Sequence, residues 1–510
     1  MYYLVINLGL RSIRALLLDE RGQVHSMNWY PVQTVIDHQR VEQNPIEWWK
    51  LTGVLLHEVF DKNEDYRKNL KSITVTASAC CLVMLDKKDQ PVDNSYLVSD
   101  KRSMAEANTL AEDKTLAELF KNPNFLPSPS FMIPKMIWFY RHNKRKFKTV
   151  TRFMGANDYL LYKLTGTCVT DSLNAEKFYF DSNTQSYPKK LLKQLGVTPK
   201  QLPKVQPVGT VLGPVKKEIA RELGLSAKVS VIVTTYDAIC AFLGSGALQE
   251  GESCNVCGTV SSIRAFTQQN VKPNGGILKQ QMGDFSIVGG SNNIDGGLLE
   301  WSKNMFYGDS YPEKYVYKIM EDEASLSPAG SKGLVFLPYL IGERLPFFNA
   351  HARGVFFGLE RFHKRNDIMR SVFEASGFMA NDIISTIEKS GVNIHTIRMS
   401  GGMARNSLLC QIRADITGKN ILLIDEVEIT SLGAFFIMRK ALKEIKKYEE
   451  VLESIKIKQQ YQPNPQHHAM YQQLFSFFKK LYHGTEELMK TRNELHGTLL
   501  QSSRHILENL

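Results

Sequence analysis

Two strand–turn–strand segments, one near the start of each half of the chain, constrain the fold most strongly. Within residues 2–19, two apolar runs flank a polar turn that contains Gly9, and residues 253–266 place Gly258 and Thr259 at a second bend. Short apolar runs joined by a polar turn with glycine are typical of β-hairpins. Trp48, Leu51, Leu55 and Phe60 recur at helical spacing and predict a helix over 45–60, and residues 393–424 read as strand, glycine turn, amphipathic helix and strand. No short repeat period indicates a solenoid. The sequence therefore predicts an α/β chain made of two comparable halves.

The length of the chain supports two domains. Its 510 residues exceed the ~250–300 residues at which a single hydrophobic core stops growing. Glycines cluster at 244–251, so we expect an N-terminal domain over 1–246 and a C-terminal domain over 247–483. Residues 484–510 form a predicted helical extension. Packing or a subunit contact, as in a homodimer, is the expected role of that extension.

Composition excludes several classes of protein. With 43% hydrophobic and 23% charged residues, the chain has the composition of a folded protein. No segment approaches the ~18 uncharged apolar residues of a membrane helix, and the N-terminus lacks an export signal. We therefore expect a cytoplasmic protein with no membrane partner. The odd number of cysteines, seven, indicates reduced thiols, and the pair Cys254 and Cys257 lacks the further ligands of a zinc site.

The net charge favours an anionic partner. Lys and Arg outnumber Asp and Glu by 63 to 52, which gives +11. Nucleotides, sugar phosphates, nucleic acid and acidic surfaces all fit such a charge. The basic residues are widely spread, and the one dense run, at 141–148, is typical of a solvated helix end. Nucleic-acid binding rests on charge alone, and we expect no nucleic-acid partner.

Asp237 is the most informative carboxylate. It follows the apolar run 229–235 and precedes an apolar helical segment. Ligands of open α/β sheets gather at the carboxyl ends of strands, where a carboxylate can accept a proton or hold a metal. Asp is also a favoured N-cap of helices. Position alone leaves both interpretations open.

Glycines mark a second candidate region. Gly401 and Gly402 stand between a predicted strand and a helix, where the backbone can approach a ligand and the helix N-terminus can meet an anion. A tight turn is the alternative. Two hairpins with Gly9 and Gly258–Thr259 at their bends could together cradle a triphosphate through backbone amides.

Residues 333–359 differ from an ordinary core segment. Glu343, Arg344 and Pro346 form a charged, rigid loop between apolar runs. Such loops often carry function, although a buried Glu–Arg pair can also be structural.

With these pieces in order, the chain resembles the FGGY carbohydrate kinases, the group that contains xylulose, ribulose, gluconate and glycerol kinases. The segment 336–359 is similar to the pentulose-kinase segment around a G-E-R-x-P loop, and VTTYDAICAFLGSG and CGTV resemble the family's catalytic and second phosphate segments. Other similar segments follow in the family's order: PKMIW (134–138), ANDYLLYKLTG with TDSLNA (156–175), GGLLEW (296–301), GGMARNSLLCQIRADITG (401–418) and EITSLGA (428–434).

The resemblance implies two ribonuclease H-like domains, as in actin-like ATPases, with ATP and sugar meeting in a central cleft. It implies that Asp237 is the catalytic base and that Asn7 and Asp237 stand at the Mg²⁺ site. The sugar-contacting positions would be Ala79, Cys80, Asp100 and Asp237. The nucleotide-binding positions would be Gly9, Ser12, Arg14, Gly258, Thr259, Gly296, Glu300, Gly401, Gly402 and Asn406.

Three departures from the family pattern bear on function. The family's first loop begins D-x-G-T, whereas this chain has Asn7 and, at the hydroxyl position, Leu10. The sugar-contacting pair is replaced by Ala79 and Cys80, and W-N-D-x-R becomes V-S-D-K-R at 98–102. We expect weaker Mg²⁺ binding, and the sequence does not name the sugar.

Two functions are therefore weighed. The first is ATP-dependent phosphorylation of a sugar or polyol, a pentulose or related open-chain carbohydrate, with a small-molecule carbohydrate as partner. The alternative is a catalytically weakened relative that binds nucleotide or sugar as a sensor or scaffold, as Asn7, Leu10 and the Ala79–Cys80 pair would suggest.

Overall fold

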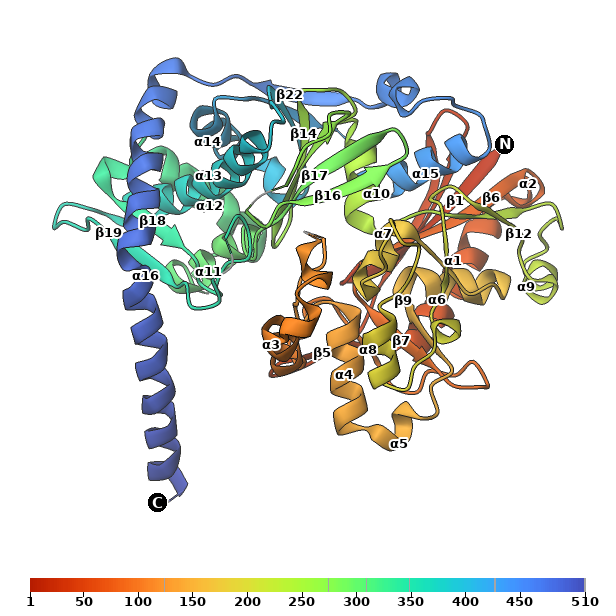
Figure 1. Cartoon of the computed structure of the whole chain (residues 1–510). Helices are drawn as coiled ribbons and strands as arrows, with labels where there is room; N and C mark the ends of the chain where they lie inside the picture. The colour runs from red at the N-terminus through yellow and green to blue at the C-terminus, as the bar shows by residue number, and fades with distance from the viewer. Residues whose placement is uncertain (123, 274, 309, 348, 426–427, 509–510) are drawn as a thin grey trace. The chain divides into compact units, whose positions relative to one another are not determined.

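The computed structural model describes residues 1–510 except 123, 274, 309, 348, 426–427 and 509–510, and the side chains of 496–508 lie outside the description as well. The chain forms two compact units (Figure 1). Unit 1 comprises Met1–Gly246 and Glu428–Ile455, and unit 2 comprises Ala247–Val427 and Lys456–Leu510. The chain thus returns to unit 1 late in the sequence. The predicted division at residue 246 assigned these late residues to the C-terminal domain.

Unit 1 is built on a six-stranded sheet. Its strands, in spatial order, are β12 (Val211–Pro214), β13 (Ser230–Val233), β6 (Leu70–Ala77), β1 (Tyr2–Leu8), β2 (Ser12–Asp19) and β3 (Val24–Pro31). The predicted first hairpin is confirmed, since β1 and β2 pair antiparallel. Strands β1, β6 and β13 run parallel. Their carboxyl ends therefore meet at one edge of the sheet.

Helices cover both faces of this sheet. On one face, α1 (Pro45–Phe60) and α6 (Ala156–Thr165) share a core with Leu4 and Ile6 of β1. The helix predicted from the spacing of apolar residues in 45–60 is confirmed. It begins after Asn44, whose side chain accepts a hydrogen bond from the Ile46 backbone N–H at 2.9 Å.

The other face is covered by α10 (Asp237–Ser245) and α15 (Ile429–Ala441). These two helices pack backbone against backbone. A Cβ atom added at Gly433 would lie 1.8 Å from the carbonyl oxygen of Cys240, and one added at Gly244 would lie 1.8 Å from that of Ile429. This close packing is the physical reason why residues 428–455 belong to unit 1.

Unit 1 has a second sheet, of five strands, which includes the strands β7 and β8 that follow β6 in the chain. Its strands, in spatial order, are β4 (Thr34–Asp37), β5 (Arg40–Gln43), β8 (Ser95–Tyr96), β7 (Leu82–Leu85) and β9 (Arg152–Gly155). Helix α4 (Met132–His142) packs onto this sheet through Ile133, Met136 and Phe139.

Unit 2 repeats the strand arrangement of unit 1. Its seven-stranded sheet has the order β16 (Leu278–Met282), β17 (Phe285–Ser291), β15 (Ser261–Thr267), β14 (Glu252–Cys257), β20 (Thr396–Ser400), β21 (Asn420–Ile424) and β22 (Ile457–Tyr461). The second predicted hairpin is confirmed by antiparallel β14 and β15, and β14, β20 and β21 run parallel. Antiparallel strands followed by parallel strands, seen in both sheets, confirm two comparable halves.

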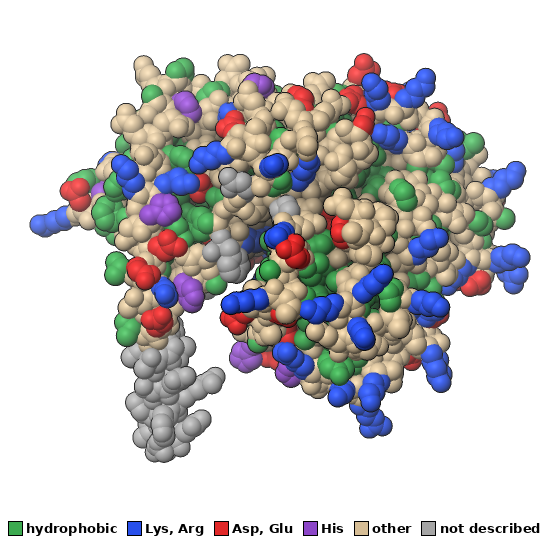
Figure 2. Space-filling view, in the orientation of Figure 1, with side chains coloured by type: hydrophobic (Ala, Val, Ile, Leu, Met, Phe, Trp, Pro, Cys, Tyr) green, Lys and Arg blue, Asp and Glu red, His purple; other side chains and the backbone are tan. Residues whose placement is uncertain are grey.

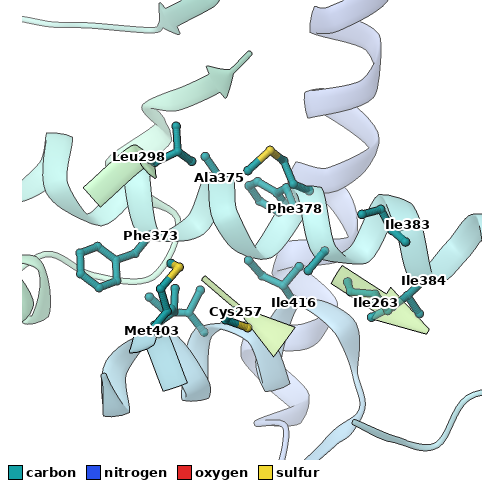
Figure 3. Packing of buried hydrophobic residues seen from close by; sticks show 14 of the residues in the cluster. Cys257, Ile263, Leu298, Phe373, Ala375, Phe378, Ile383, Ile384, Met403 and Ile416 are labelled. Carbon is teal, nitrogen blue, oxygen red and sulfur yellow. The ribbon is translucent and has the colours of Figure 1, made fainter. Parts of the chain in front are cut away.

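The core of unit 2 surrounds α13 (Arg365–Lys389), a helix of 25 residues. Phe373 and Phe378 of α13 belong to one cluster with Ile263 of β15 and Ile416 of α14 (Ser407–Thr417). Figure 3 shows Phe373 beside Met403, and Ile384 of α13 beside Ile263. The strand, glycine turn, helix and strand predicted over 393–424 are confirmed as β20, the turn 401–406, α14 and β21.

The last helix, α16 (Pro465–Glu508), is continuous through Gly484, so the predicted start of an extension at 484 falls inside a helix. Residues 509–510 of that extension lie outside the described residues. Within the described chain, no helix is both long and apolar enough to cross a membrane. On the face shown in Figure 2, Lys and Arg side chains are scattered rather than gathered in one stripe.

Candidate active site

The carboxyl ends of β1, β6 and β13 bring Asp237 next to the residues that follow β6. The Ser78 backbone N–H donates to the Leu8 carbonyl at 3.1 Å, which joins the ends of β6 and β1. The Ser78 hydroxyl donates to Asp237 Oδ2 at 2.7 Å, and the Ala238 N–H donates to Oδ1 at 2.7 Å. The N-cap position of α10 belongs to Tyr236, so Asp237 is the first helical residue rather than the cap. Its carboxylate is oriented and partly exposed.

Asn7, at the end of β1, is buried and belongs to a polar chain that reaches α15. Its amide Nδ2 donates to the Ser431 hydroxyl at 3.4 Å, and that hydroxyl lies 3.5 Å from Glu428 Oε2. Arg14 Nη1 pairs with Glu428 Oε1 at 3.0 Å. Two residues expected near metal and nucleotide are thus linked within unit 1. Glu428 was not among the residues that the sequence singled out as functional.

The turn of the first hairpin holds Gly9 and Ser12. The Gly9 N–H donates to the Ser12 carbonyl at 2.9 Å, and Ser12 is 7% exposed. A Cβ atom at Gly9 would meet only the Ser12 carbonyl oxygen, at an ordinary 3.5 Å. The turn itself therefore does not require glycine at this position.

The loop after β6 is fixed by a buried lysine. Cys80 is buried and adopts a left-handed backbone conformation with φ of 61°, beside the partly exposed Ala79. Its carbonyl accepts from Lys135 Nζ at 2.6 Å, and Lys135 also donates to the Leu97 carbonyl at 2.7 Å. Burial disfavours the ammonium ion and lowers the pKa of Lys135 to about 8. Lys135 lies in the PKMIW motif, which was the only signal of its role.

Asp100 is fully buried, and contacts within the protein engage both of its carboxylate oxygens. Arg102 donates to them through Nε at 2.8 Å and Nη2 at 2.7 Å, and the Val41 N–H donates at 2.7 Å. Asp100 thereby anchors the loop that follows β8.

In unit 2, three of the predicted nucleotide-binding segments lie against one another. The Gly296 N–H, at the start of α11 (Gly296–Phe306), donates to the Gly258 carbonyl at 2.9 Å. A Cβ atom at Gly296 would lie 2.4 Å from that oxygen, and one at Gly401, where φ is 96°, would lie 2.4 Å from the Cys257 oxygen. Gly258 and Thr259 are exposed at the hairpin turn. Glycine is thus required at 296 and 401 by close backbone contact.

The other nucleotide candidates of unit 2 have more ordinary surroundings. Asn406 caps α14, because its side chain accepts from the Leu409 N–H at 2.8 Å. A Cβ atom at Gly402 would find nothing within 4 Å, so this backbone is open. Glu300 lies exposed on α11.

A buried network of charged and polar residues, which the sequence did not reveal, includes Asp295, the neighbour of Gly296. Arg413 of α14 is 1% exposed and forms an ion pair with Asp295, the N-cap of α11, which is also fully buried. Arg413 Nη1 donates to Asn255 Oδ1 at 2.6 Å and contacts Cys257 Sγ at 2.7 Å, and Nη2 lies 2.8 Å from the Ser376 hydroxyl. One guanidinium thus ties β14, α11, α13 and α14 together.

The Glu343–Arg344 loop holds the segment that precedes α11. Glu343 Oε1 accepts from the Asn293 N–H at 2.9 Å, and Arg344 donates to the carbonyls of Ser291 at 2.8 Å and Asn292 at 3.1 Å. Burial raises the pKa of the Glu343 carboxyl to about 7. These bonds give both charged residues structural partners in unit 2.

The cysteines carry no sign of metal or disulfide chemistry in the described chain. None of the seven forms a disulfide, and Cys254 and Cys257 stand three residues apart on β14, where side chains at that spacing point to opposite faces. Across the described residues, no group of three or more His, Cys, Asp or Glu side chains is arranged to hold a metal.

Comparison with known proteins decides the family. Residues 2–244 match the N-terminal domain of the FGGY family of carbohydrate kinases, and residues 254–441 match the C-terminal domain of that family. The chain belongs to the FGGY family of carbohydrate kinases. It is therefore a phosphotransferase that carries out ATP-dependent phosphorylation of a sugar or polyol.

Individual relatives extend over nearly the whole chain. A xylulose kinase of Staphylococcus epidermidis is 28% identical over 95% of this chain and 97% of its own length. A gluconokinase of Bacillus subtilis is 25% identical over 89% and 90%.

Solved structures confirm the fold class. A ligand-bound xylulose kinase of Lactobacillus acidophilus superposes with a TM-score of 0.88 at 23% identity, over 95% of this chain and 98% of its own. A glycerol kinase of Plasmodium falciparum with ADP gives 0.84 at 20% identity, over 95% and 98%. The predicted pair of ribonuclease H-like, actin-like domains is thereby confirmed.

Proposed function

We propose that the chain transfers the terminal phosphoryl group of MgATP to a hydroxyl of a pentulose or related open-chain carbohydrate, with Asp237 as general base. The observation that carries this proposal is the orientation of the Asp237 carboxylate at the carboxyl edge of the unit 1 sheet. Ser78 and the Ala238 N–H hold its two oxygens, each at 2.7 Å. Names among the relatives, xylulose kinase and gluconokinase, support a linear sugar or sugar acid as acceptor.

The backbone and side-chain groups at the predicted nucleotide and metal positions suit MgATP. Backbone contacts at Gly296 and Gly401 hold three of the predicted phosphate-binding segments together, and the open backbone at Gly402 leaves room for a phosphate close to the main chain. Mg²⁺ in kinases is usually held by one or two carboxylates together with substrate phosphates and water, which fits Asp237 with Asn7 at the same edge of the sheet. When bound, MgATP supplies the phosphoryl group and neutralises its developing charge.

The roles of the protein's own residues follow from chemistry. Asp237 accepts the proton of the acceptor hydroxyl, and Ser78 keeps that carboxylate turned toward the open edge. Lys135 keeps the 78–81 loop in place through the Cys80 carbonyl. Amides at Gly258 and Gly402 would bind the phosphates, and Asn406 keeps the N-terminus of α14 ordered.

An ADP-release assay over a panel of pentuloses, hexuloses, sugar acids and glycerol tests the proposal. We expect acceptor-stimulated turnover for at least one compound, and a loss of about 10²–10⁴-fold in kcat for Asp237→Asn. The matched control is Asp322→Asn, the same change at an exposed carboxylate outside the assigned sites, which should keep the turnover of the wild type. If Asp237→Asn kept turnover within threefold of the wild type, Asp237 would not be the base. Absence of any acceptor-stimulated turnover in the folded wild type would refute the substrate class.

Two further expectations accompany this function. A homodimer is tested by light scattering of the eluted protein, and a cytoplasmic location by cell fractionation. The sensor or scaffold alternative finds no support in the family and its relatives.

A further inference from the structure

A cavity of about 240 Å³ lies within unit 2, where α13, α16 and the loop after β18 (Val335–Pro338) come together. This volume is room for several water molecules, or for one small metabolite. The residues assigned above to sugar, nucleotide and metal are not among its described lining.

Charge in the described lining favours an anion. Lys479 Nζ pairs with Asp382 Oδ1 at 2.6 Å, and Asp382 is 2% exposed. Lys389 and His483 complete the charged lining, so two lysines face one carboxylate, and His483 adds a further positive charge when it is protonated. Glu486 lies 3.9 Å from His483 on the same helix but outside this lining. The local charge is therefore +1 or +2.

The walls between these charges are aromatic. Tyr339 is 2% exposed, and its ring lies 5.3 Å from that of Tyr482, which stacks on Phe347 with 4.3 Å between centroids. Phe478 adds a fourth ring. Aromatic faces carry partial negative charge and attract the C–H groups of a sugar backbone, whereas the Asp382 carboxylate, which Lys479 holds at Oδ1, can accept hydrogen bonds from its hydroxyls. A cationic rim with aromatic walls and hydroxyl-binding groups matches a phosphorylated carbohydrate.

We propose that this cavity is a second binding site of the protein, which takes a small phosphorylated sugar or sugar acid. Lys389, Lys479 and His483 bind the phosphate, and the aromatic walls with Asp382 bind the carbon skeleton. The choice of a phosphorylated carbohydrate rests in part on the proposed function, since that reaction yields such a product. The anionic character of the ligand rests on the lining alone.

The cavity also adjoins the loop that holds the start of α11. Pro346 and Phe347 line the cavity, and Glu343 and Arg344 of the same loop bind residues 291–293. The Asn292 N–H donates to the Ser261 carbonyl of the second hairpin at 3.0 Å. A bound ligand that displaces Phe347 would therefore shift residues 291–293, which contact the hairpin of Gly258 and precede Gly296. We expect occupancy of the cavity to change the KM for ATP and leave the acceptor KM unchanged.

Calorimetric titration of the full-length protein with D-xylulose 5-phosphate, without nucleotide, tests the site. We expect two binding events in the wild type and one in the double variant Lys389→Ala/His483→Ala, because the product still binds at the active site. Both replaced side chains are exposed, so folding should be retained. The matched control is Lys480→Ala, an exposed neighbour on α16 outside the described lining, which should keep both events.

Other probes separate the alternatives. A single event in the wild type, or two unchanged events in the double variant, would overturn the second site. Inorganic phosphate or ADP that bound the second site as tightly as the phosphosugar would overturn the carbohydrate assignment. Turnover of the double variant without added product should equal that of the wild type. Because the readout is binding, a wild type without kinase activity would refute the proposed function and leave the result for the cavity intact.

Discussion

Removal of the Arg413 guanidinium should both destabilise unit 2 and weaken nucleotide binding. In Arg413→Met, the Asp295 carboxylate stays fully buried without its cationic partner, and Asn255 and Ser376 lose a hydrogen-bonding partner. Breaking a buried ion pair by removing one partner costs about 3–5 kcal/mol. Since whole domains are stable by only ~5–15 kcal/mol, this is a large fraction of the stability of unit 2.

Nucleotide binding should weaken because Arg413 holds Asp295 in place beside the second hairpin. Asp295 immediately precedes Gly296, and its N–H donates to the Thr259 carbonyl at 2.8 Å. An uncompensated carboxylate at this position should shift the start of α11 away from the hairpin turn. We therefore expect the KM for ATP to rise about tenfold, with the acceptor KM unchanged, at a temperature where the variant is still folded.

Denaturant unfolding followed by tryptophan fluorescence, with steady-state kinetics on the same preparations, measures both effects. The double variant Arg413→Met/Asp295→Asn is the decisive control, because removing both charges of a buried pair is often nearly neutral. It should recover most of the lost stability. The reasoning would be refuted if Arg413→Met lost less than ~1 kcal/mol, or if the double variant were as unstable as the single one.

Three further predictions use other contacts. Asn7→Asp should lower the Mg²⁺ concentration needed for half-maximal turnover, because a carboxylate replaces the amide beside Ser431; an unchanged Mg²⁺ titration would contradict this. Gly433→Ala should destabilise unit 1 by about 3 kcal/mol or more in denaturant unfolding, because the added methyl group would lie 1.8 Å from the Cys240 carbonyl oxygen. The control Gly484→Ala, where nothing lies within 4 Å of the added methyl group, should be neutral or stabilising. Glu343 has a folded-state pKa raised to about 7, so its protonated form contributes stability that is fully present below the unfolded-state pKa near 4.5 and is lost as the pH rises through 7. Relative to Glu343→Gln, the wild type should therefore lose stability between pH 4.5 and 7, and parallel stability–pH curves for the two proteins would be the contrary result.

Much of the fold could be predicted from the sequence because it depends on local patterns. The hairpin that contains Gly9 and the helix 45–60 follow from turn residues and the spacing of apolar side chains, and neighbouring backbone groups satisfy their hydrogen bonds. The place of Asp237 after a buried strand also indicated an edge position, and the motif order indicated the family. Asp100 was predicted to contact the sugar, and its engagement by Arg102 and by the Val41 N–H was not visible in the sequence.

What the sequence by itself determined, then, is the two hairpins, the helix over 45–60, the order of the family's motifs and the identity of the residues at those strand ends. Only the tertiary structure decided which distant groups pair. Arg413 and Asp295 are 118 residues apart, and Lys135 is 55 residues from Cys80. A buried charge must find partners wherever the packed chain brings them, and no local pattern marks those partners. The return of residues 428–455 to unit 1 has the same cause, since backbone contact at Gly433 exists only once α10 and α15 have packed.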